Sequence, residues 1–206
     1  MKTYIFTTKG CRQKTPVRVL GFFAVLIGAG CQTPHTSTGT DAQGMISLRH
    51  VHTHERLDLP VSLSSLGDGL NETELDENQL ALFFRDWRTH QRHTMSPRLI
   101  SHLVAIAQHF GQPIEIVSAY RAGARTTSRH RHGKAVDFRL AGVSPEVVWR
   151  YAKRFQHIGL GLYPKSGFVH IDIRRRSYYW IDDSGPGEPS RYRRGVRQPR
   201  ISLSKR

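Results

Sequence analysis

The chain has few cysteines, and this scarcity limits how it can be stabilised. Its 206 residues include two, Cys11 and Cys31. Cys11 belongs to an N-terminal segment that we expect to be removed, so the mature chain has no pair able to form a disulfide. A mature chain of about 175 residues suits one domain, and we expect that domain to be held together by its hydrophobic core.

The chain also lacks an apolar run long enough to cross a membrane comfortably. The apolar residues 19–30 follow a basic stretch without acids that contains Lys2, Lys9 and Arg12. They end in small residues before Cys31, which is typical of a secretory signal, so we assign residues 1–31 to a leader. This boundary resembles that of bacterial lipoproteins: either Cys31 carries a lipid or the leader is cleaved in the ordinary way. We expect an exported protein of the periplasm or cell envelope, with a membrane contact only through a lipid at Cys31.

Acidic residues are scarce as well. The sequence has 16 Asp and Glu against 31 Lys and Arg, a formal net charge of +15. The excess favours anionic partners. It gathers in the leader and in residues 183–206, which we expect to form a basic disordered tail, either simply solvated or anchored to an anionic surface. A nucleic-acid-binding protein would be expected to carry basic patches interleaved with aromatic residues inside the domain. Because the excess charge here is concentrated in the leader and tail instead, we expect no specific nucleic-acid partner.

The middle of the chain predicts one α+β domain. Residues 32–45 are rich in Thr, Gly and Ser and are expected to be a flexible tether before a domain at 46–182. Ser96-Pro97 and Ser144-Pro145 are typical helix starts, and Gly111 is a typical helix end. Apolar periodicity adds a helix near 74–89, a strand pair over 46–57, and strands near 114–117, 135–140, 159–163 and 168–174.

The strongest chemical signal lies in residues 128–137. His130 and Asp137 are seven residues apart, and a later strand at 168–172 carries His170. Two imidazoles and one carboxylate are a ligand set of catalytic zinc sites, which keep a fourth position open for water. Asp137 lies between apolar neighbours, where an unpaired buried carboxylate is costly and a metal ion would offset the cost.

Twelve histidines leave alternatives to this ligand set. His132 competes with His130 on composition. The triplet His50, His52 and His54 could bind a metal from one strand face, although alternating polar residues on a strand usually face water.

The pattern Ser128-x-His130-x-x-Gly133-x-Ala135-x-Asp137 resembles the signature of the zinc D,D-peptidase superfamily. With residues 47–57, 118–121 and 159–172, the chain resembles the YcbK-like (MepK-type) murein endopeptidases over residues 46–182. The resemblance implies a small antiparallel sheet that carries the zinc site, with helices packed on one side. It also implies zinc-dependent hydrolysis of peptide bonds in peptidoglycan stem peptides or cross-links, by a murein endopeptidase or by a D,D- or L,D-carboxypeptidase. The alternative is a non-catalytic cell-wall-binding module on the same fold.

The resemblance also assigns roles to residues. It implies that His130, Asp137 and His170 bind Zn²⁺, and that His132 occupies a variable position. Arg121 is then expected to point at the scissile amide, where a guanidinium would stabilise the oxyanion that develops in the transition state.

The proton acceptor is the part of the site that the resemblance leaves open. Related enzymes carry an acidic residue three positions, or a histidine two positions, before the last ligand. This chain has Gly167 and Phe168 there, and neither can accept a proton. Asp172, two residues after His170 on the same strand face, is the nearest candidate. It either accepts the proton or orients a zinc-bound imidazole.

Overall fold

The computed structural model describes residues 44–65, 76–194 and 196–198. The expected leader at 1–31, most of the expected tether at 32–45 and the end of the expected tail lie outside the described residues. Met45, at the end of the expected tether, is already the first residue of a strand. Within the described ranges, no helix combines the length and apolar character needed to cross a membrane.

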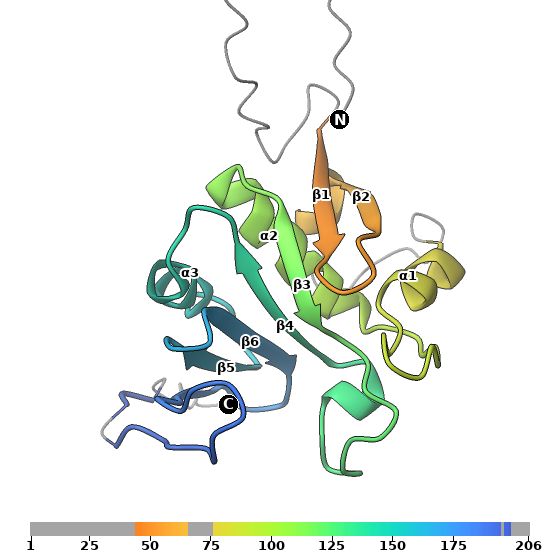
Figure 1. The fold of residues 1–206 in the computed structure, drawn as a ribbon. Coiled ribbons are helices and arrows are strands. Elements are labelled where there is room, and N and C mark those ends of the chain that lie inside the picture. The colour runs from red at the N-terminus through yellow and green to blue at the C-terminus, as the bar shows by residue number, and fades with distance from the viewer. Residues whose placement is uncertain (1–43, 66–75, 195, 199–206) are drawn as a thin grey trace, which may run out of the picture. The chain divides into compact units, whose positions relative to one another are not determined.

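In the part of the chain that the structure describes, seven strands form one mixed sheet in the order β2-β1-β3-β4-β6-β5-β7 (Figure 1). Their bounds are β1 Met45–His50, β2 Arg56–Pro60, β3 Ile114–Ser118, β4 Ala135–Leu140, β5 Ile158–Tyr163, β6 Phe168–Ile173 and β7 Tyr178–Ile181. The expected α+β class is confirmed, but the expectation of a small antiparallel sheet is wrong. β1 pairs with β3, and β5 with β7, in parallel. Parallel neighbours need a long connection, and the helical segment between β2 and β3 supplies one for the first pair.

The described residues contain three α-helices: α1 Glu77–Phe83, α2 Pro97–Phe110 and α3 Pro145–Ala152. The starts predicted at Ser96-Pro97 and Ser144-Pro145 are confirmed, as is the end at Gly111, whose φ of 60° is left-handed. Helix α1 is shorter than the expected 74–89. It begins after Asp76, whose side chain accepts hydrogen bonds from two backbone N–H groups of the first turn.

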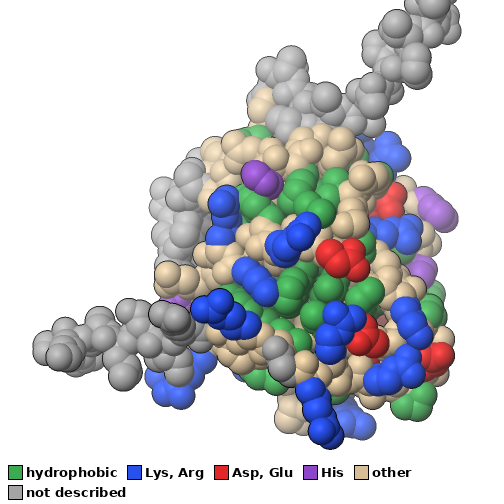
Figure 2. All heavy atoms as spheres, turned by 90° about the vertical axis from the view of Figure 1, so that its left-hand side faces the viewer, with side chains coloured by type: hydrophobic (Ala, Val, Ile, Leu, Met, Phe, Trp, Pro, Cys, Tyr) green, Lys and Arg blue, Asp and Glu red, His purple; other side chains and the backbone are tan. Residues whose placement is uncertain are grey.

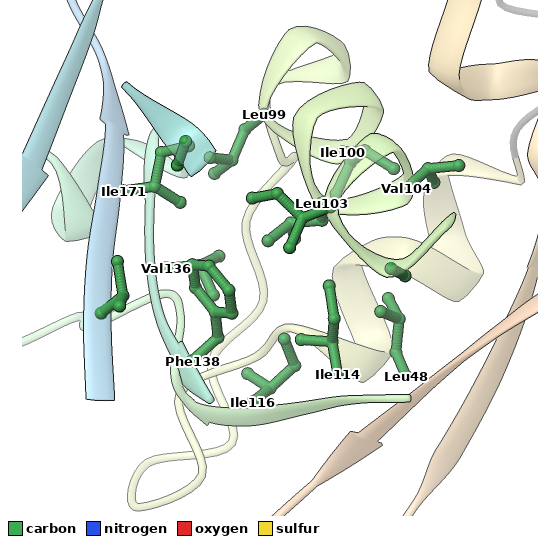
Figure 3. Packing of buried hydrophobic residues seen from close by; sticks show 14 of the residues in the cluster. Leu48, Leu99, Ile100, Leu103, Val104, Ile114, Ile116, Val136, Phe138 and Ile171 are labelled. Carbon is green, nitrogen blue, oxygen red and sulfur yellow. The ribbon is translucent and has the colours of Figure 1, made fainter. Parts of the chain in front are cut away.

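Helix α2 fills one face of the sheet. Figure 3 shows Leu99 and Leu103 on the side of the helix that faces apolar residues of β4 and β6, and Ile100 belongs to the same core. All three are fully buried. Helix α3 packs on the same face, where Trp149 Nε1 donates to the carbonyl of Leu160 on β5 at 3.3 Å. This face is the hydrophobic core that fixes the positions of the central strands.

The opposite face of the central strands carries polar and small residues. Strand register sets Asp137 on β4 opposite His170 on β6, which faces Gly161 on β5 and then Trp180 on β7. On β3 the register shifts between Ile116 and Ser118, so that Ser118 lies opposite Asp137. Such a bulge turns the side chain that follows it to the other face of the sheet. Four neighbouring strands and the end of β3 therefore contribute to one row on the open face.

The described part of the basic C-terminal segment contacts the sheet. Arg193 donates its backbone N–H to the carbonyl of Ile181 at 2.9 Å, and Gln198 forms a pair of hydrogen bonds with the backbone of Tyr179 at 2.7 and 2.8 Å. In Figure 1 this segment is part of the blue trace below β5. Residues 183–194 and 196–198 thus run against the domain, whereas the rest of the expected tail lies outside the described residues.

Candidate metal centre

His130 lies in a short 3-10 turn, His130–His132, just before β4. Its ring is buried, and Nδ1 lies 2.6 Å from the carbonyl oxygen of Ala119. Because a carbonyl only accepts, Nδ1 carries the proton and Nε2 presents a lone pair. Gly133 ends the turn with a φ of 61°, and a Cβ at this position would collide with the carbonyl oxygen of Thr94. The glycine allows the tight turn that aims the His130 ring inward.

Asp137 and His170 face each other across the β4–β6 pair. Both are buried, at 3% and 9% exposed. His170 Nδ1 lies 2.8 Å from Asp137 Oδ1 and 3.3 Å from His130 Nε2. His130 Nε2 is 3.4 Å from the same carboxylate oxygen. The three candidate ligand atoms therefore meet at one point in the sheet.

This convergence fits a cation. The opposite nitrogen of His170, Nε2, lies 3.1 Å from Asp172 Oδ2 and donates to it. If both imidazoles are neutral, His130 Nε2 and His170 Nδ1 each carry a lone pair. Both lone pairs face the Asp137 carboxylate, and no hydrogen-bond donor of the described chain lies between these three acceptors. Such a set of acceptors requires a proton or a metal ion. Among the described residues, His130, Asp137 and His170 form the one group of three or more potential ligands whose atoms lie within 4.8 Å of one another.

The pKa values of the site follow from the same contacts. Burial lowers the pKa of His170, but its bonds to Asp137 and Asp172 outweigh burial and raise it to about 9. Burial raises the pKa of Asp137, and the two imidazoles more than reverse this, so that its pKa lies well below the ordinary value. The centre thus attracts positive charge even without a metal.

Asp172 lies behind His170 rather than in front of the open position. Its Oδ1 accepts a hydrogen bond from Arg174 Nε at 2.7 Å. Its Oδ2, which contacts His170 Nε2, also accepts one from Arg174 Nη2. Burial raises its pKa, but these two partners outweigh it and lower the pKa to about 2. The structure therefore brings Asp172 to the site, on the side of the imidazole away from the other two candidate ligands.

Arg121 follows β3 and reaches the other edge of Asp137. Its Nη2 bonds Asp137 Oδ2, and its Nε donates to Ser118 Oγ at 2.7 Å. The side chain is 42% exposed, and Nη1 has no protein partner among the described residues. The backbone of the same loop is held by Asp86, which accepts the N–H of Ala122 at 2.9 Å. Arg121 thus presents free N–H groups beside the candidate metal ligands.

Several residues of the site were not predicted from the sequence. Arg174 lies two residues after Asp172, and this i, i+2 spacing on a strand could have indicated a shared face. On β5, Gly159 and Gly161 alternate on the open face. A Cβ on Gly159 would overlap Asp172 and Arg174, and one on Gly161 would lie 2.5 Å from the Trp180 ring. The Gly-x-Gly spacing in this strand could have indicated that side chains of neighbouring strands approach its backbone closely.

Trp180 gave no such local signal, and the sequence indicated Ser118 only as the first residue of the matching segment 118–121. The Trp180 ring lies 5.2 Å from the His170 ring, and its indole N–H donates to the Tyr163 hydroxyl at 3.1 Å. Ser118 reaches the site only because of the bulge in β3. Both depend on strand pairing between distant segments, which the sequence alone does not specify.

The alternative ligands do not meet at this point. The His132 ring is exposed, and its Nε2 lies 2.6 Å from the carbonyl oxygen of Thr126. In the other histidine group, His50 is buried at the end of β1, whereas the His52 ring stacks on Trp87 at 4.0 Å. The rings of His50 and His52 are 5.9 Å apart, and among the residues that the structure describes they are not part of any group of three potential metal ligands.

Comparison with known proteins gives one family for most of the chain. The family described as peptidoglycan L,D-endopeptidase MepK matches residues 38–177. A protein of Haemophilus influenzae named probable peptidoglycan L,D-endopeptidase MepK is 33% identical over 143 residues, which cover 62% of this chain and 74% of that protein. The Escherichia coli K12 protein named peptidoglycan L,D-endopeptidase MepK is 28% identical over 171 residues, which cover 75% and 91%. No solved structure is significantly similar to the chain.

Proposed function

Because this chain belongs to the peptidoglycan L,D-endopeptidase MepK family, we propose that it is a metallopeptidase that hydrolyses peptide bonds in the cross-links of peptidoglycan. One observation carries the proposal. The inward atoms of His130, Asp137 and His170 converge within 4.8 Å, and the outward nitrogens of both imidazoles already have acceptors. This leaves the inward atoms of the three side chains available as metal ligands and fixes their orientation.

We propose zinc as the metal, since two imidazoles and one carboxylate suit a catalytic zinc ion with an open coordination position. When bound, zinc lowers the pKa of a water ligand towards about 7 and polarises a carbonyl group. The protein residues fix the tautomers: His130 keeps its proton on Nδ1, and His170 keeps its proton on Nε2. The sheet core behind them keeps the three side chains in place.

Arg121 supplies the second electrostatic element of the proposed mechanism. Its contacts with Asp137 and Ser118 use Nη2 and Nε, so Nη1 is available to bind the carbonyl oxygen of a substrate peptide. The bond strengthens as negative charge develops on that oxygen, which favours the transition state over the bound substrate.

For Asp172 we propose a positioning role, the second of the two roles expected from the sequence. Its oxygens are occupied by His170 Nε2 and Arg174, and its low pKa makes it a weak proton acceptor at neutral pH. A carboxylate in this place holds a ligating imidazole and increases its basicity towards the metal.

The proposed substrate implies an envelope location. Hydrolysis of peptidoglycan requires export, in agreement with the expected leader at 1–31, which we propose directs the chain to the periplasm or cell envelope. The chain is basic, and Lys and Arg side chains outnumber Asp and Glu on the face drawn in Figure 2. We propose that this charge assists contact with an anionic wall or membrane surface, with a lipid at Cys31 as a further tether.

The experiment that tests the function uses the purified protein loaded with Zn²⁺ and cross-linked murein, with products identified by mass spectrometry. We expect new peptide fragments from the wild type and from His132→Ala, and none from His130→Ala. His132→Ala is the matched control, since that ring lies two residues away and is exposed. Murein retained by the zinc-loaded wild type without any cleavage would instead identify a non-catalytic wall-binding module.

A further inference from the structure

A cleft of about 560 Å³ lies at the β7 edge of the sheet, next to the candidate metal centre. Its walls come from β7 and from the described part of the C-terminal segment. The side chains that matter for its chemistry are Tyr178, Trp180, Tyr192, Arg174, Arg193 and Arg194. No role in the proposed hydrolysis has been given to this cleft.

The cleft adjoins the metal centre through Trp180. Strand register puts Trp180 opposite Gly161, and Gly161 opposite His170, so the indole covers the glycine and reaches the imidazole. Tyr178, two residues before Trp180, points to the same face, and the two rings stack with centroids 6.1 Å apart. The open face therefore continues from the metal ligands onto an aromatic surface at the sheet edge.

These aromatic side chains are unusually exposed. Four large hydrophobic side chains are exposed in the described part of the chain, and two of them, Tyr178 at 51% and Tyr192 at 61%, line this cleft. Exposed apolar surface gathered in a hollow, with a few polar groups, is typical of a ligand site. Each tyrosine offers a flat apolar ring and one hydroxyl group, which suits a ligand with apolar faces and hydroxyl or amide edges.

The charges around the cleft indicate the net charge of the ligand that it suits. Arg174 is paired with Asp172, and Arg193 with Asp183 at 2.6 Å, so two of the three arginines in the cleft are neutralised. A different hollow, near the start of α2, collects more basic residues, among them Arg129, Lys134 and Arg175, and its lining includes no aromatic residue of the Tyr or Trp type. A ligand with several carboxylates suits that hollow better, whereas the aromatic cleft suits one with little net charge.

We propose that the aromatic cleft binds the amino-sugar strand of peptidoglycan while the metal centre acts on the attached peptide. This inference rests on the proposed function, which makes peptidoglycan the substrate. N-acetylated sugar rings present apolar C–H faces that pack on Tyr178 and Tyr192, and their hydroxyl and amide groups can bond to arginine. Binding the strand beside the metal centre raises the local concentration of the cross-links to be cut.

Binding of the sugar strand can be measured apart from catalysis. Peptide-free glycan strands are titrated into the metal-free full-length protein by calorimetry. We expect the double variant Tyr178→Ala/Tyr192→Ala to bind about tenfold more weakly than wild type, as expected when ring packing is lost. Leu82→Ala is the matched control, because Leu82 is an exposed apolar residue on α1 that does not line the cleft. We expect it to bind the strands as wild type does.

A second assay separates failure of this inference from failure of the proposed function. The zinc-loaded wild type is given soluble cross-linked peptides that carry no sugar. If it cleaves them but the double variant binds glycan strands as tightly as wild type, the sugar site is wrong and the peptidase stands. If it leaves them intact but glycan binding depends on the two tyrosines, the peptidase is wrong and the sugar site stands. If the double variant loses binding of a stem peptide but keeps binding of glycan strands, the cleft binds the peptide instead.

Discussion

Two groups of histidines in this protein have similar composition and opposite environments. His130 and His170 meet a carboxylate on the open face of the sheet, with their ring nitrogens 3.3 Å apart. His50 and His52 lie in the β1–β2 hairpin, where His50 Nδ1 accepts backbone N–H groups of His52 and Thr53 at 3.2 and 3.3 Å. The first group points lone pairs at a shared point, and the second uses a lone pair to hold a turn.

The pKa values record the same difference. Burial, with His52 nearby, lowers the pKa of His50 to about 4. Burial also acts on His170, yet two carboxylates reverse it and raise the pKa to about 9. Clustered imidazoles are therefore a weak indication of a metal site. A metal site is better indicated by two other features. The outward ring nitrogens donate hydrogen bonds, and the inward ring nitrogens face a shared carboxylate.

Removing a metal ligand should give the largest effect. We expect His130→Ala to lower turnover of cross-linked peptides by about a thousandfold or more, because loss of one transition-state stabiliser alone costs about 10²–10³. His52→Ala, in the other histidine group, should leave turnover close to wild type. Steady-state kinetics with equal zinc loading measures both. Comparable losses in the two variants would contradict the division between the groups.

Removing the acceptor behind His170 should have an intermediate effect. We expect Asp172→Asn to weaken zinc binding by about 10- to 100-fold, as for other groups that orient metal-bound histidines. Titration against a chelator of known affinity measures this. Asp58→Asn is the control, since Asp58 lies on β2 and pairs with Arg56 near the surface. If Asp172 were the proton acceptor instead, zinc affinity would be unchanged and turnover alone would fall.

Filling the space under Trp180 should have a smaller effect, on stability. A Cβ at Gly161 would lie 2.5 Å from the indole ring, so Gly161→Ala must displace Trp180 from His170. We expect the free energy of unfolding to fall by about 1–3 kcal/mol, the usual cost of overpacking. Gly123→Ala is the matched control, because nothing lies within 4 Å of its added Cβ. Urea denaturation compares the two, and equal stabilities would show that the close approach of Trp180 is not required.

Changing the hairpin histidine should leave turnover unaffected and alter only how stability depends on pH. The pKa of His50 falls from 6.5 to about 4 on folding, so the unfolded chain binds the proton between these values and the folded protein does not. His50 therefore contributes full stability above pH 6.5 and loses it as the pH falls towards 4, by at most about 1.4 kcal/mol per pH unit.

His50→Gln removes this titration. Its difference in unfolding free energy from wild type, measured by denaturation across pH 4–7, should shrink as the pH falls. The charged and titratable groups facing His50 are His52, Glu55 and Arg85, and all three remain in the variant. A difference that stays constant across this range would contradict a buried, neutral His50.

Local pattern carried much of the prediction. Ser96-Pro97 and Ser144-Pro145 begin helices where expected, since proline at a first turn acts through its own backbone. The alternation around His170 predicted a strand with this side chain on one face, and the structure has it in β6. The pairing of strands could not be predicted from local sequence. The parallel pairs β1–β3 and β5–β7 join segments whose order in the sheet no local pattern specifies.

The sequence by itself supplied candidate metal ligands, because His130 and Asp137 share one short motif and His170 lies on an amphipathic strand, but it left other histidines as alternatives. It also determined that the chain is basic and has few cysteines. Only the tertiary structure decided what supports these ligands. Arg174 behind Asp172, Trp180 over Gly161 and Ser118 beside Arg121 are set by strand register and by a bulge. Register depends on how distant strands pack against α2 and α3, and that packing is a property of the whole domain.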